Sequence, residues 1–456
     1  MFGKRAPIIA LATASGKAGV GVIRLSGEDL RAFTEELFQI ELIPRQATLL
    51  TLKSANSEPI DTGLAIFFPS PNSFTGEDVL EFQGHGGILV MDLIIQRCLE
   101  VGKPYHLRLA NPGEFSERAF LNNKIDLAQA EAIADLIDAN SQAAVKSASR
   151  SLTGVFSIEV NELIDRLTQL RVLVEATLDF PEEEIDFLEK AQAKDQWLFI
   201  CQRLNKLLKA SEQGAILRTG ALVVLAGAPN VGKSSILNQL AGQDLAIVTP
   251  VAGTTRDRLR ETIQIDGVPV QLIDTAGLRD AIDEVEKLGI ERSWQTIREA
   301  DVILFIRDIS QLNETEYDGL YIEIQRGISH EVPPPIMIEV WNKQDATKHM
   351  QDQDRLVISA KTGYGFEELR ARILQAIGWE SQSENVIFAR QRHIDALLRG
   401  LEHVQNAGNY LSLGNQSLEL FAEELRLAQV SLGEITGKVL ADELLGKIFS
   451  SFCIGK

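Results

Sequence analysis

The chain has 456 residues, which is too long for one compact core, so we expect two to four domains. With 45% hydrophobic and 24% charged residues, its composition is that of an ordinary globular protein and excludes a disordered or fibrous chain. The net charge of −19 argues against broad electrostatic binding to nucleic acid, although a local basic patch or a partner could still supply positive charge.

The N-terminus and the cysteines indicate a cytoplasmic protein. The stretch MFGKRAPIIALATASGK has a short, alternating apolar part, which predicts a strand rather than a secretory signal. No apolar run approaches the ~18 residues that span a bilayer, so we expect no membrane segment. Cys98, Cys201 and Cys453 lie far apart and predict neither a disulfide framework nor a cysteine-rich zinc site. The six histidines are scattered, so we expect no transition-metal site.

Residues 1–119 alternate short apolar runs with Gly, Pro and Asn breaks, as in GVGVIRLSG and DVLEFQGHGG. This pattern predicts strands with one or two helices, one of them over 86–102. From residue 120 the sequence pattern is that of helices, with apolar residues spaced three and four apart. The spacing predicts amphipathic helices over 126–152, 155–180 and 195–211, with a solvated turn at Pro181 and the acidic run after it.

Strands and helices alternate over 216–382, as an α/β domain requires, and the helical texture returns over 383–456. Helices are predicted there over 389–408, 417–437 and 442–452. Two helical blocks on either side of an α/β block suggest one helical domain with another domain inserted into it. Two independent helical domains are the alternative, and the sequence alone leaves both open.

A phosphate-binding loop follows the buried run ALVVLA. Residues 227–234 read GAPNVGKS and are followed by a helix, which is the strand–loop–helix setting that this motif requires. Its glycines let backbone N–H groups surround the phosphates, and the helix N-terminus adds partial positive charge. Lys233 is expected to reach the β- and γ-phosphates, and Ser234 to ligate Mg²⁺.

Four further motifs follow in the order of a GTPase. Thr255 in GTTRD offers a second Mg²⁺ ligand, and DTAG closes the run VPVQLID. NKQD places Asp345 where its carboxylate can accept two hydrogen bonds from guanine, and SAK can back the guanine ring. Each alone could be turn chemistry, but all five together predict a GTP-binding domain specific for guanine. The predicted GTP-binding residues are Gly227, Asn230, Val231, Gly232, Lys233, Ser234, Ser235, Thr249, Thr254, Thr255, Asp274, Thr275, Ala276, Gly277, Asn342, Lys343, Asp345, Ser359, Ala360 and Lys361.

The residue after DTAG is Leu278, where Ras-like proteins have a glutamine that orients the attacking water. Leucine cannot hydrogen-bond water, so another group must do this or hydrolysis is poor. The segment RDAIDEVEKLGIERSW supplies candidate carboxylates, and position alone does not choose among Asp280, Asp283, Glu284 and Glu286.

The whole chain resembles the bacterial GTPases that modify the wobble uridine of tRNA, the MnmE/TrmE family. The resemblance is carried by GVGVIRLSG, VLEFQGHGG, FLNNKIDLAQAEAI, GAPNVGKSSILN, IVTPVAGTTRD, DTAGLRDAIDEVEKLGIER, NKQD and the terminal FCIGK. It implies a multidomain α/β and α fold. An N-terminal α+β domain (1–119) binds folate and dimerises, a helical domain comes from two segments (120–215 and 383–456), and a Ras-like P-loop GTPase domain (216–382) is inserted.

The resemblance also implies site residues in the GTPase domain. Glu286 matches a catalytic glutamate that positions the attacking water, and Arg256 and Asp257 match switch-loop residues needed for activity. Asn230 matches a K⁺ ligand, with Thr249, Val251 and Thr254 completing the potassium site. Such a site forms when two GTPase domains meet, and K⁺ there takes the charge that an arginine finger otherwise neutralises.

Outside the GTPase domain, the resemblance implies a folate site at Arg24, Glu81, Lys124 and the terminal Lys456. A pterin edge suits the carboxylate of Glu81. For Arg24, Glu81 and Lys124 taken individually, a surface salt bridge is the commoner explanation. The resemblance further implies a homodimer and an FAD-dependent flavoprotein partner in a heterotetramer. The one-carbon unit of 5,10-methylene- or 5-formyl-tetrahydrofolate would build an aminomethyl or carboxymethylaminomethyl group on C5 of uridine 34.

Two other classes of protein share single features with this chain. A ribosome-assembly GTPase can have leucine after the D-x-x-G motif, but that class usually carries a basic RNA-binding module, and the C-terminal helices here are acidic. Membrane anchoring through Cys453 fails as a prenylation motif, because Gly455 and Lys456 do not fit the pattern. Cys453 is therefore expected either to react, if its thiol pKa is lowered, or to pack as a small apolar residue.

Overall fold

The computed structural model describes residues 5–139, 141–179, 193–242, 260–274, 293–310, 314–347, 355–380, 386–411, 413, 417–438, 442–450, 452 and 455. The chain divides into two compact units. One comprises residues 1–134 with 432–456, and the other comprises residues 135–431. The domain boundaries expected from the sequence stay a prediction.

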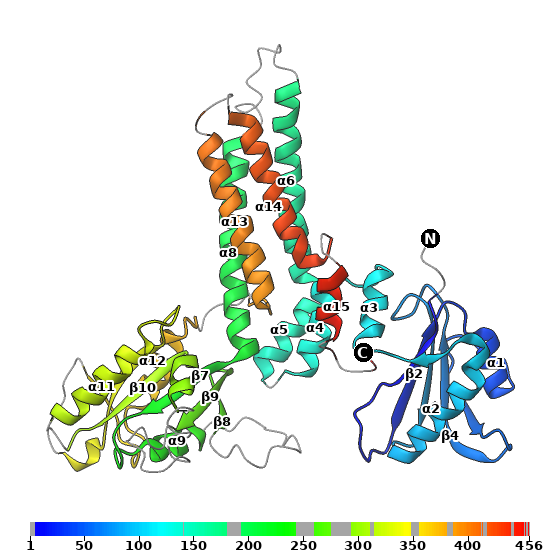
Figure 1. Cartoon of the computed structure of the whole chain (residues 1–456), viewed down its shortest axis with the longest axis horizontal. Coiled ribbons are helices and arrows are strands. Elements are labelled where there is room, and N and C mark those ends of the chain that lie inside the picture. The colour runs from blue at the N-terminus through cyan, green and yellow to red at the C-terminus, as the bar shows by residue number, and fades with distance from the viewer. Residues whose placement is uncertain are drawn as a thin grey trace. The chain divides into compact units, whose positions relative to one another are not determined.

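The first unit is built on a six-stranded sheet with the strand order β3-β4-β5-β2-β1-β6 (Figure 1). Its strands pair antiparallel except for β1 and β6. The elements of this part are β1 Ile8–Leu11, β2 Gly21–Gly27, α1 Arg31–Phe38, β3 Thr48–Lys53, β4 Pro59–Phe68, β5 Asp78–Gly84, α2 Ile88–Gly102, η1 Lys103–Tyr105, β6 Arg108–Leu109, α3 Glu114–Leu121, α4 Leu127–Ile137 and α15 Asp442–Ser450.

Helices α1 and α2 cover one face of this sheet. Ile23 and Leu25 of β2 are fully buried against Phe33 of α1 and Ile94 of α2. Because side chains alternate along a strand, Arg24 lies on the opposite face of the sheet, away from both helices.

The last helix of the chain packs within the first unit. Phe449 and Phe452 are buried with Leu127 and Ala130 of α4 in one apolar cluster. Gly113 has a left-handed φ of 68°, and a Cβ there would lie 2.4 Å from the carbonyl oxygen of Phe449. The close approach of this C-terminal segment therefore requires glycine before α3.

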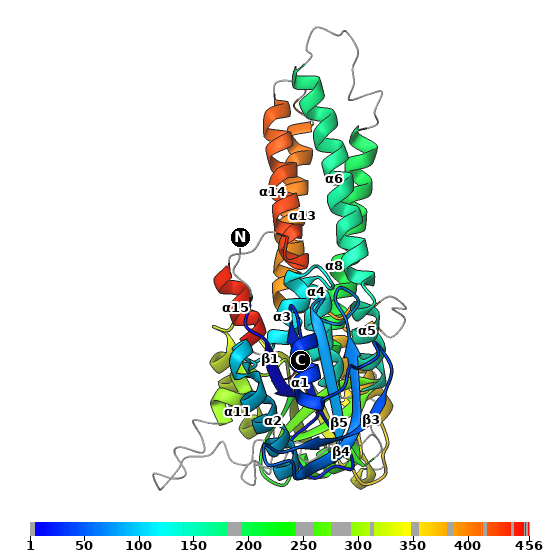
Figure 2. The same ribbon diagram turned by 90° about the vertical axis from the view of Figure 1, so that its right-hand side faces the viewer.

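The second unit contains a helical bundle made from both helical blocks of the sequence. Helices α6, α8, α13 and α14 run side by side in both views (Figures 1 and 2). Trp197 Nε1 donates to the carbonyl of Val404 at 2.6 Å, and Arg171 donates to Gln429 at 2.6 Å. One helical domain formed by two segments is thus confirmed. The helices of this part are α5 Gln142–Leu152, α6 Val155–Asp179, α8 Ala193–Thr219, α13 Gln391–Leu411 and α14 Leu418–Thr436.

The single helix predicted over 126–152 is wrong. The chain forms two helices, α4 and α5, and Ser141 begins the second one. Its backbone is extended, and its side chain accepts a hydrogen bond from the N–H of Ala144 at 3.1 Å. A serine N-cap satisfies a donor that a continuous helix would have bonded internally, so the apolar spacing continues while the helix does not.

The GTPase part of the second unit is a six-stranded sheet of order β12-β11-β10-β7-β9-β8, parallel except for the β8–β9 pair. Apolar clusters lie on both faces, around Val223 and Leu304 on one and Val224 and Phe305 on the other. The elements are β7 Ala221–Ala226, α9 Lys233–Ala241, β8 Arg260–Ile265, β9 Val268–Asp274, β10 Val302–Asp308, α11 Glu314–Ile328, β11 Ile336–Asn342, η2 Gln344–Ala346, β12 Leu356–Val357 and α12 Phe366–Ala376.

Helix α5 belongs to the core of the GTPase part. Ala144 and Ala148 are buried in the same apolar cluster as Ile265 and Val268 of the β8–β9 hairpin. A Cβ added at Gly267, in the hairpin turn, would lie 3.4 Å from the Cβ of Ala143. The GTPase sheet and the helical segment before it therefore share one packed core.

Candidate nucleotide site and N-terminal site

The loop between β7 and α9 needs glycine at two positions. Gly227 has φ +144°, and a Cβ there would lie 2.5 Å from the carbonyl oxygen of Ile306. Gly232 has φ +98°, and a Cβ there would lie 2.3 Å from Asn342 Nδ2. Both positions combine a left-handed backbone with a close neighbour, so the motif glycines allow the loop to fold against β10 and β11.

This loop and the first turn of α9 border a cavity of about 530 Å³. A helix N-terminus points backbone N–H groups at this space and favours negative charge there. The cavity can therefore take the phosphates of a nucleotide. Its lining residues are Pro229, Asn230, Gly232, Lys233, Ser234, Ser235 and Asp274.

Lys233 is half-buried in this cavity. Its Nζ donates to the carbonyls of Gly227 at 3.0 Å and Ala228 at 3.1 Å. Burial lowers the pKa of Lys233 below its usual value, and the nearby carboxylate of Asp274 opposes this shift. The cationic side chain is thus held inside the loop by two neutral carbonyls, which an anionic phosphate oxygen can replace at an electrostatic gain.

Ser234 and Asp274 form the part of the cavity that fits a divalent cation. Ser234 Oγ donates to Asp274 Oδ2 at 2.8 Å. Asp274 Oδ1 is buried and accepts no hydrogen bond from the described residues. A buried carboxylate oxygen without a donor, next to a hydroxyl, is the oxygen donor set that Mg²⁺ prefers.

Asn342 joins the phosphate loop to the loop expected to hold the base. Its Nδ2 donates to the carbonyl of Val231 at 2.9 Å, and its Oδ1 accepts from the N–H of Ala360 at 3.0 Å. Asn342 is 2% exposed, and its bond to Val231 is buried. Three strand ends, those of β7, β11 and β12, are therefore fixed relative to one another.

Asp345 stands at the expected base-binding position with its carboxylate ready to accept hydrogen bonds. Ser359 donates to Asp345 Oδ1 at 2.6 Å, and Lys361 Nζ lies 3.9 Å from Oδ2. The hydrogen bond from Ser359 lowers the pKa of Asp345. The group is thus a carboxylate at neutral pH, as recognition of guanine N–H groups requires.

The sequence analysis missed Asp308, the last residue of β10. It is 2% exposed, and its carboxylate lies 2.6 Å from the ammonium of Lys343. Burial would raise the pKa of Asp308, but the hydrogen bonds from Lys343 and Ser310 lower it. The one available signal was an acidic residue at the end of a predominantly apolar run, VILFIRD.

Several expected site residues lie outside the described residues, and their roles stay predictions. They are Thr249, Val251, Thr254, Thr255, Arg256, Asp257, Thr275, Ala276, Gly277, Glu286, Cys453 and Lys456. Of the expected potassium ligands, the structure therefore places Asn230 alone. It lines the phosphate cavity and has a left-handed φ of 63°.

In the first unit, Arg24 and Glu81 are paired with each other. They are cross-strand neighbours on β2 and β5, and Glu81 Oε1 accepts from Arg24 Nε at 2.8 Å and lies 2.7 Å from Nη2. The guanidinium of Arg24 also lies 5.7 Å from the ring centre of Phe74. Lys124 Nζ donates to the carbonyl of Pro71 at 3.0 Å. The loop between β4 and β5, residues 69–77, thus links the three described folate candidates.

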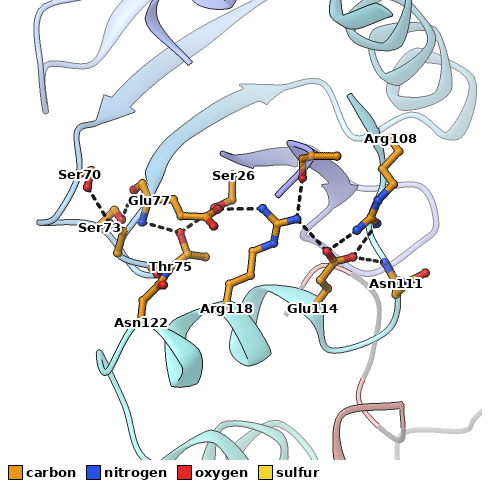
Figure 3. A network of polar contacts seen from close by, with 12 residues as sticks. Ser26, Ser70, Ser73, Thr75, Glu77, Arg108, Asn111, Glu114, Arg118 and Asn122 are labelled. Atoms are coloured by element: carbon orange, nitrogen blue, oxygen red, sulfur yellow. Dashed lines mark hydrogen bonds and ion pairs between the residues drawn. The ribbon is translucent and has the colours of Figure 1, made fainter. Parts of the chain in front are cut away.

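A buried ionic network anchors this loop (Figure 3). Arg118 of α3 is 2% exposed and donates to Glu77 at 2.9 Å and to Glu114 at 2.8 Å. Ser26 donates to Glu77 at 2.8 Å, and Arg108 makes two bonds to Glu114, at 2.7 Å and 2.6 Å. The two arginines compensate the charges of the two glutamates, so the network fixes the loop relative to α3.

The described cysteines are free thiols with raised pKa values. Burial raises the pKa of Cys98 to about 12 and that of Cys201 to about 11, so both remain protonated at neutral pH. Within the described ranges, no group of three or more His, Cys, Asp or Glu side chains could hold a metal ion. Among those same residues, no helix has the length and apolar character to cross a membrane.

The chain matches two family models that together span most of its length. Residues 7–124 match the N-terminus of the GTP-binding protein TrmE, and residues 127–453 match the MnmE helical domain. A solved structure of Aquifex aeolicus Era bound to GDP and AlF4⁻ is 25% identical, with a TM-score of 0.28, and covers 40% of this chain and 66% of that one.

Curated relatives match from end to end. The tRNA modification GTPase MnmE of Polynucleobacter asymbioticus is 55% identical over 462 residues, covering 100% of both chains. The tRNA modification GTPase MnmE of a Polaromonas species is 51% identical, covering 99% of this chain and 98% of that one. With this full-length similarity and a P-loop GTPase sheet inserted between two helical segments, the chain belongs to the MnmE family of tRNA modification GTPases.

Proposed function

We propose that this GTP hydrolase acts in the cytoplasm with an FAD-dependent flavoprotein to build an aminomethyl or carboxymethylaminomethyl group on C5 of the wobble uridine of tRNA. The proposal rests on the full-length similarity to tRNA modification GTPases. The relatives are named tRNA modification GTPases, and the described part of the nucleotide site supports GTP binding. The working form is a homodimer that joins the flavoprotein in a heterotetramer.

GTP is held at two places on the carboxyl edge of the GTPase sheet. Lys233 moves from its two carbonyl partners to the β- and γ-phosphates, and Asp345 accepts hydrogen bonds from guanine. Ser234, Thr255 and Asp274 surround Mg²⁺, which when bound neutralises charge that develops on the phosphates. Asn342 supports this assignment, since its two hydrogen bonds connect the phosphate loop to the base loop.

Hydrolysis uses a glutamate in place of the missing glutamine. Leu278 cannot orient water, so Glu286 positions the attacking water, with Arg256 and Asp257 acting in the same switch region. Asn230, Thr249, Val251 and Thr254 hold K⁺ once two GTPase domains meet, and K⁺ supplies positive charge beside the phosphates. Asn230 supports this step because it borders the phosphate cavity.

The one-carbon unit comes from a tetrahydrofolate held in the first unit. Glu81 accepts N–H donors of the pterin, while Arg24, Lys124 and Lys456 bind the anionic parts of the molecule. The ion pair with Arg24 orients the carboxylate of Glu81. The C-terminal Cys453 acts near this site.

The potassium mechanism is tested by GTP turnover at equal ionic strength in K⁺ and in Na⁺. We expect turnover in K⁺ to be at least about 10-fold faster, because an extra positive charge at the phosphates stabilises the transition state. Asn230→Ala should remove the difference while GDP still binds. Equal wild-type rates in the two salts would refute the mechanism.

The folate assignment is tested by titration with 5-formyl-tetrahydrofolate. We expect saturable binding, and Glu81→Gln should weaken it about 10-fold or more, since a charge-assisted pair of hydrogen bonds is lost. Glu58→Gln, at an exposed position in the turn between β3 and β4, is the matched control and should bind as the wild type does. If no saturable binding occurs, the one-carbon role is wrong.

A further inference from the structure

Asp308 lies beside the expected base site but belongs to none of the GTPase motifs. It ends β10 at the point where the neighbouring parallel strand, β11, ends in Asn342, its cross-strand partner. The N–H of Ile309 donates to the carbonyl of Asn342 at 3.0 Å, so the two strand ends stay joined after the ladder stops. The Asp308 carboxylate is therefore fixed next to the first residues of the base loop.

Both oxygens of this carboxylate are engaged. Oδ1 accepts from the N–H of Ser310 at 2.9 Å and from Ser310 Oγ at 2.6 Å. Oδ2 accepts from Lys343 Nζ at 2.6 Å. A carboxylate that is 2% exposed can remain charged only with such compensation, so Lys343 is part of what makes its burial tolerable.

Lys343 is in turn fixed at both its backbone and its ammonium. Its backbone has a left-handed φ of 68°, which few residues other than glycine and asparagine adopt readily. The residue before it, Asn342, is hydrogen-bonded to Val231 and Ala360. Two residues after it, Asp345 accepts a hydrogen bond from Ser359. The bond to Asp308 then orders the four-carbon stem, which would otherwise keep most of its rotamer freedom at 36% exposure.

We propose that Asp308 is a positioning residue for the guanine nucleotide, which acts by holding the Lys343 side chain in place before the nucleotide arrives. Ordering a flexible lysine side chain costs conformational free energy. Where the protein has already ordered this side chain, nucleotide binding does not include that cost, and the affinity for the nucleotide rises. The inference rests on the proposed role of Asn342, Lys343 and Asp345 in binding guanine.

The test compares nucleotide affinity with turnover. Asp308→Asn keeps the volume but removes the charge, and we expect the Kd for fluorescent GDP to rise about 10-fold, mainly through faster release. The turnover number at saturating GTP should stay within about 2-fold, because Asp308 lies at the base end and not at the phosphates. A purely structural defect would lower both the affinity for GDP and the turnover number. An unchanged Kd overturns the proposal.

A double-mutant cycle isolates the link to Lys343. In a Lys343→Met background, which keeps an unbranched apolar stem, Asp308→Asn should cause no further loss of GDP affinity. Losses that simply add would show that Asp308 acts by another route. Asp318→Asn is the matched control. This carboxylate is 51% exposed and pairs with Arg307, the residue before Asp308, so its loss should leave the Kd unchanged.

Two further variants keep the result interpretable. Asp345→Asn should shift preference from GTP to xanthosine triphosphate. If it does not, the proposed base site itself fails, whereas a shift together with an unchanged Kd in Asp308→Asn refutes only the positioning role. If Asp308→Asn does not fold, Ser310→Ala removes one of the three hydrogen bonds to the carboxylate and should raise the Kd about 2- to 3-fold. An unchanged Kd in Ser310→Ala then overturns the proposal.

Discussion

Lys233 illustrates how the phosphate site is arranged before it binds nucleotide. Its ammonium is half-buried and satisfied by the carbonyls of Gly227 and Ala228. Asp274 is hydrogen-bonded to Ser234 through one oxygen, while the other oxygen, buried, accepts no bond from the described residues. The ammonium of Lys233 and the carboxylate of Asp274 are thus already in position. Their present partners, two carbonyls and a hydroxyl, interact more weakly than a phosphate or a metal ion would.

Glu286→Ala tests the water-positioning role assigned to this residue. We expect GDP and GTP to bind with unchanged Kd, because other residues make the hydrogen bonds that hold the phosphate and base loops, such as Asn342 to Val231 and Ser359 to Asp345. The turnover number should fall by about 10²- to 10³-fold, in the range that one acid–base or positioning group contributes. Single-turnover kinetics with separately measured Kd values check this, and an unchanged turnover number would remove Glu286 from the mechanism.

At this scale the sequence predicted residues in local motifs and missed residues that act across strands. Gly227, Lys233 and Asp345 stand at fixed spacing within their motifs, so each could be identified from neighbouring residues. Asp308 acts on Lys343 through the parallel register of β10 and β11, which no local pattern reveals. A salt bridge was an expected alternative for Arg24 and for Glu81, but that the two residues pair with each other depends on the register of β2 against β5.

A close connection between elements joins α8 to the segment after the GTPase part. The N–H of Ile387 donates to the carbonyl of Ala210 at 3.1 Å. Gln213 donates to the carbonyl of Gly378 at 2.6 Å and accepts from the N–H of Glu380 at 2.9 Å. The chain thus enters the GTPase part at the end of α8, and the segment that leaves the GTPase part packs against the same helix.

Gly214→Ala should break this connection. A Cβ there would lie 1.7 Å from the carbonyl oxygen of Ile387, so the segment or the helix must shift. We expect a loss of about 2–4 kcal/mol in the free energy of unfolding. The check is a urea titration followed by tryptophan fluorescence.

Gly319→Ala is the control for that experiment. Gly319 lies in α11 with nothing within 4 Å of an added Cβ, so alanine should leave stability unchanged or raise it by up to ~1 kcal/mol. Equal effects of the two substitutions would mean that the close approach at Gly214 does not matter.

The ionic network of the first unit predicts a pH-dependent stability. Burial would raise the pKa of Glu114, but hydrogen bonds from Arg108, the N–H of Asn111 and Arg118 lower it from 4.5 to about 2. A lowered carboxyl pKa stabilises the fold above pH ~4.5, and this stabilisation is lost as the pH falls toward 2. The shift corresponds to about 3 kcal/mol at neutral pH.

Hydrogen exchange in β2 and α3 measures this effect. Glu114→Gln should speed exchange strongly at pH 6, and the difference from the wild type should narrow steadily between pH 5 and pH 2. A difference that stays constant over that range would show that the charge of Glu114 is not what stabilises the network.

Element types were predictable from periodicity, but some element ends were not. The spacing of apolar residues correctly predicts helical structure over 126–152, yet it continues through the break at Ser141 because both helices bury apolar faces. The hydroxyl of Ser141 decides the break through one hydrogen bond. Helix α8 runs from Ala193 to Thr219, beyond the predicted range, because its last turns pack against the GTPase part.

For the whole molecule, the order of helical and α/β segments along the chain suggests the nested architecture but leaves two independent helical domains as an alternative. Neither helical block can bury its apolar face alone, and Trp197 and Arg171 make their bonds to the other block. The pattern of apolar residues could not predict the shared core, in which Ala144 and Ala148 of α5 pack with the GTPase sheet. That contact depends on tertiary packing of small side chains, which carry no periodic signal of their own.

Cys453→Ser tests whether the C-terminal thiol takes part in tRNA modification. If its thiol takes part in the chemistry on uridine, Cys453→Ser should keep full GTP turnover and lose tRNA modification. If the residue only packs, both activities should survive in the variant. Purified protein checks the first activity, and nucleosides from cellular tRNA check the second.

The link between nucleotide hydrolysis and tRNA modification is tested most directly by nucleoside analysis of tRNA. Cells lacking this protein would be complemented with the wild type, with Lys233→Ala, or with Asp318→Asn as the matched control. We predict that the wild type and the control restore the C5 modification of wobble uridine, whereas Lys233→Ala leaves the uridine unmodified. Full modification in cells that carry only Lys233→Ala would contradict the account.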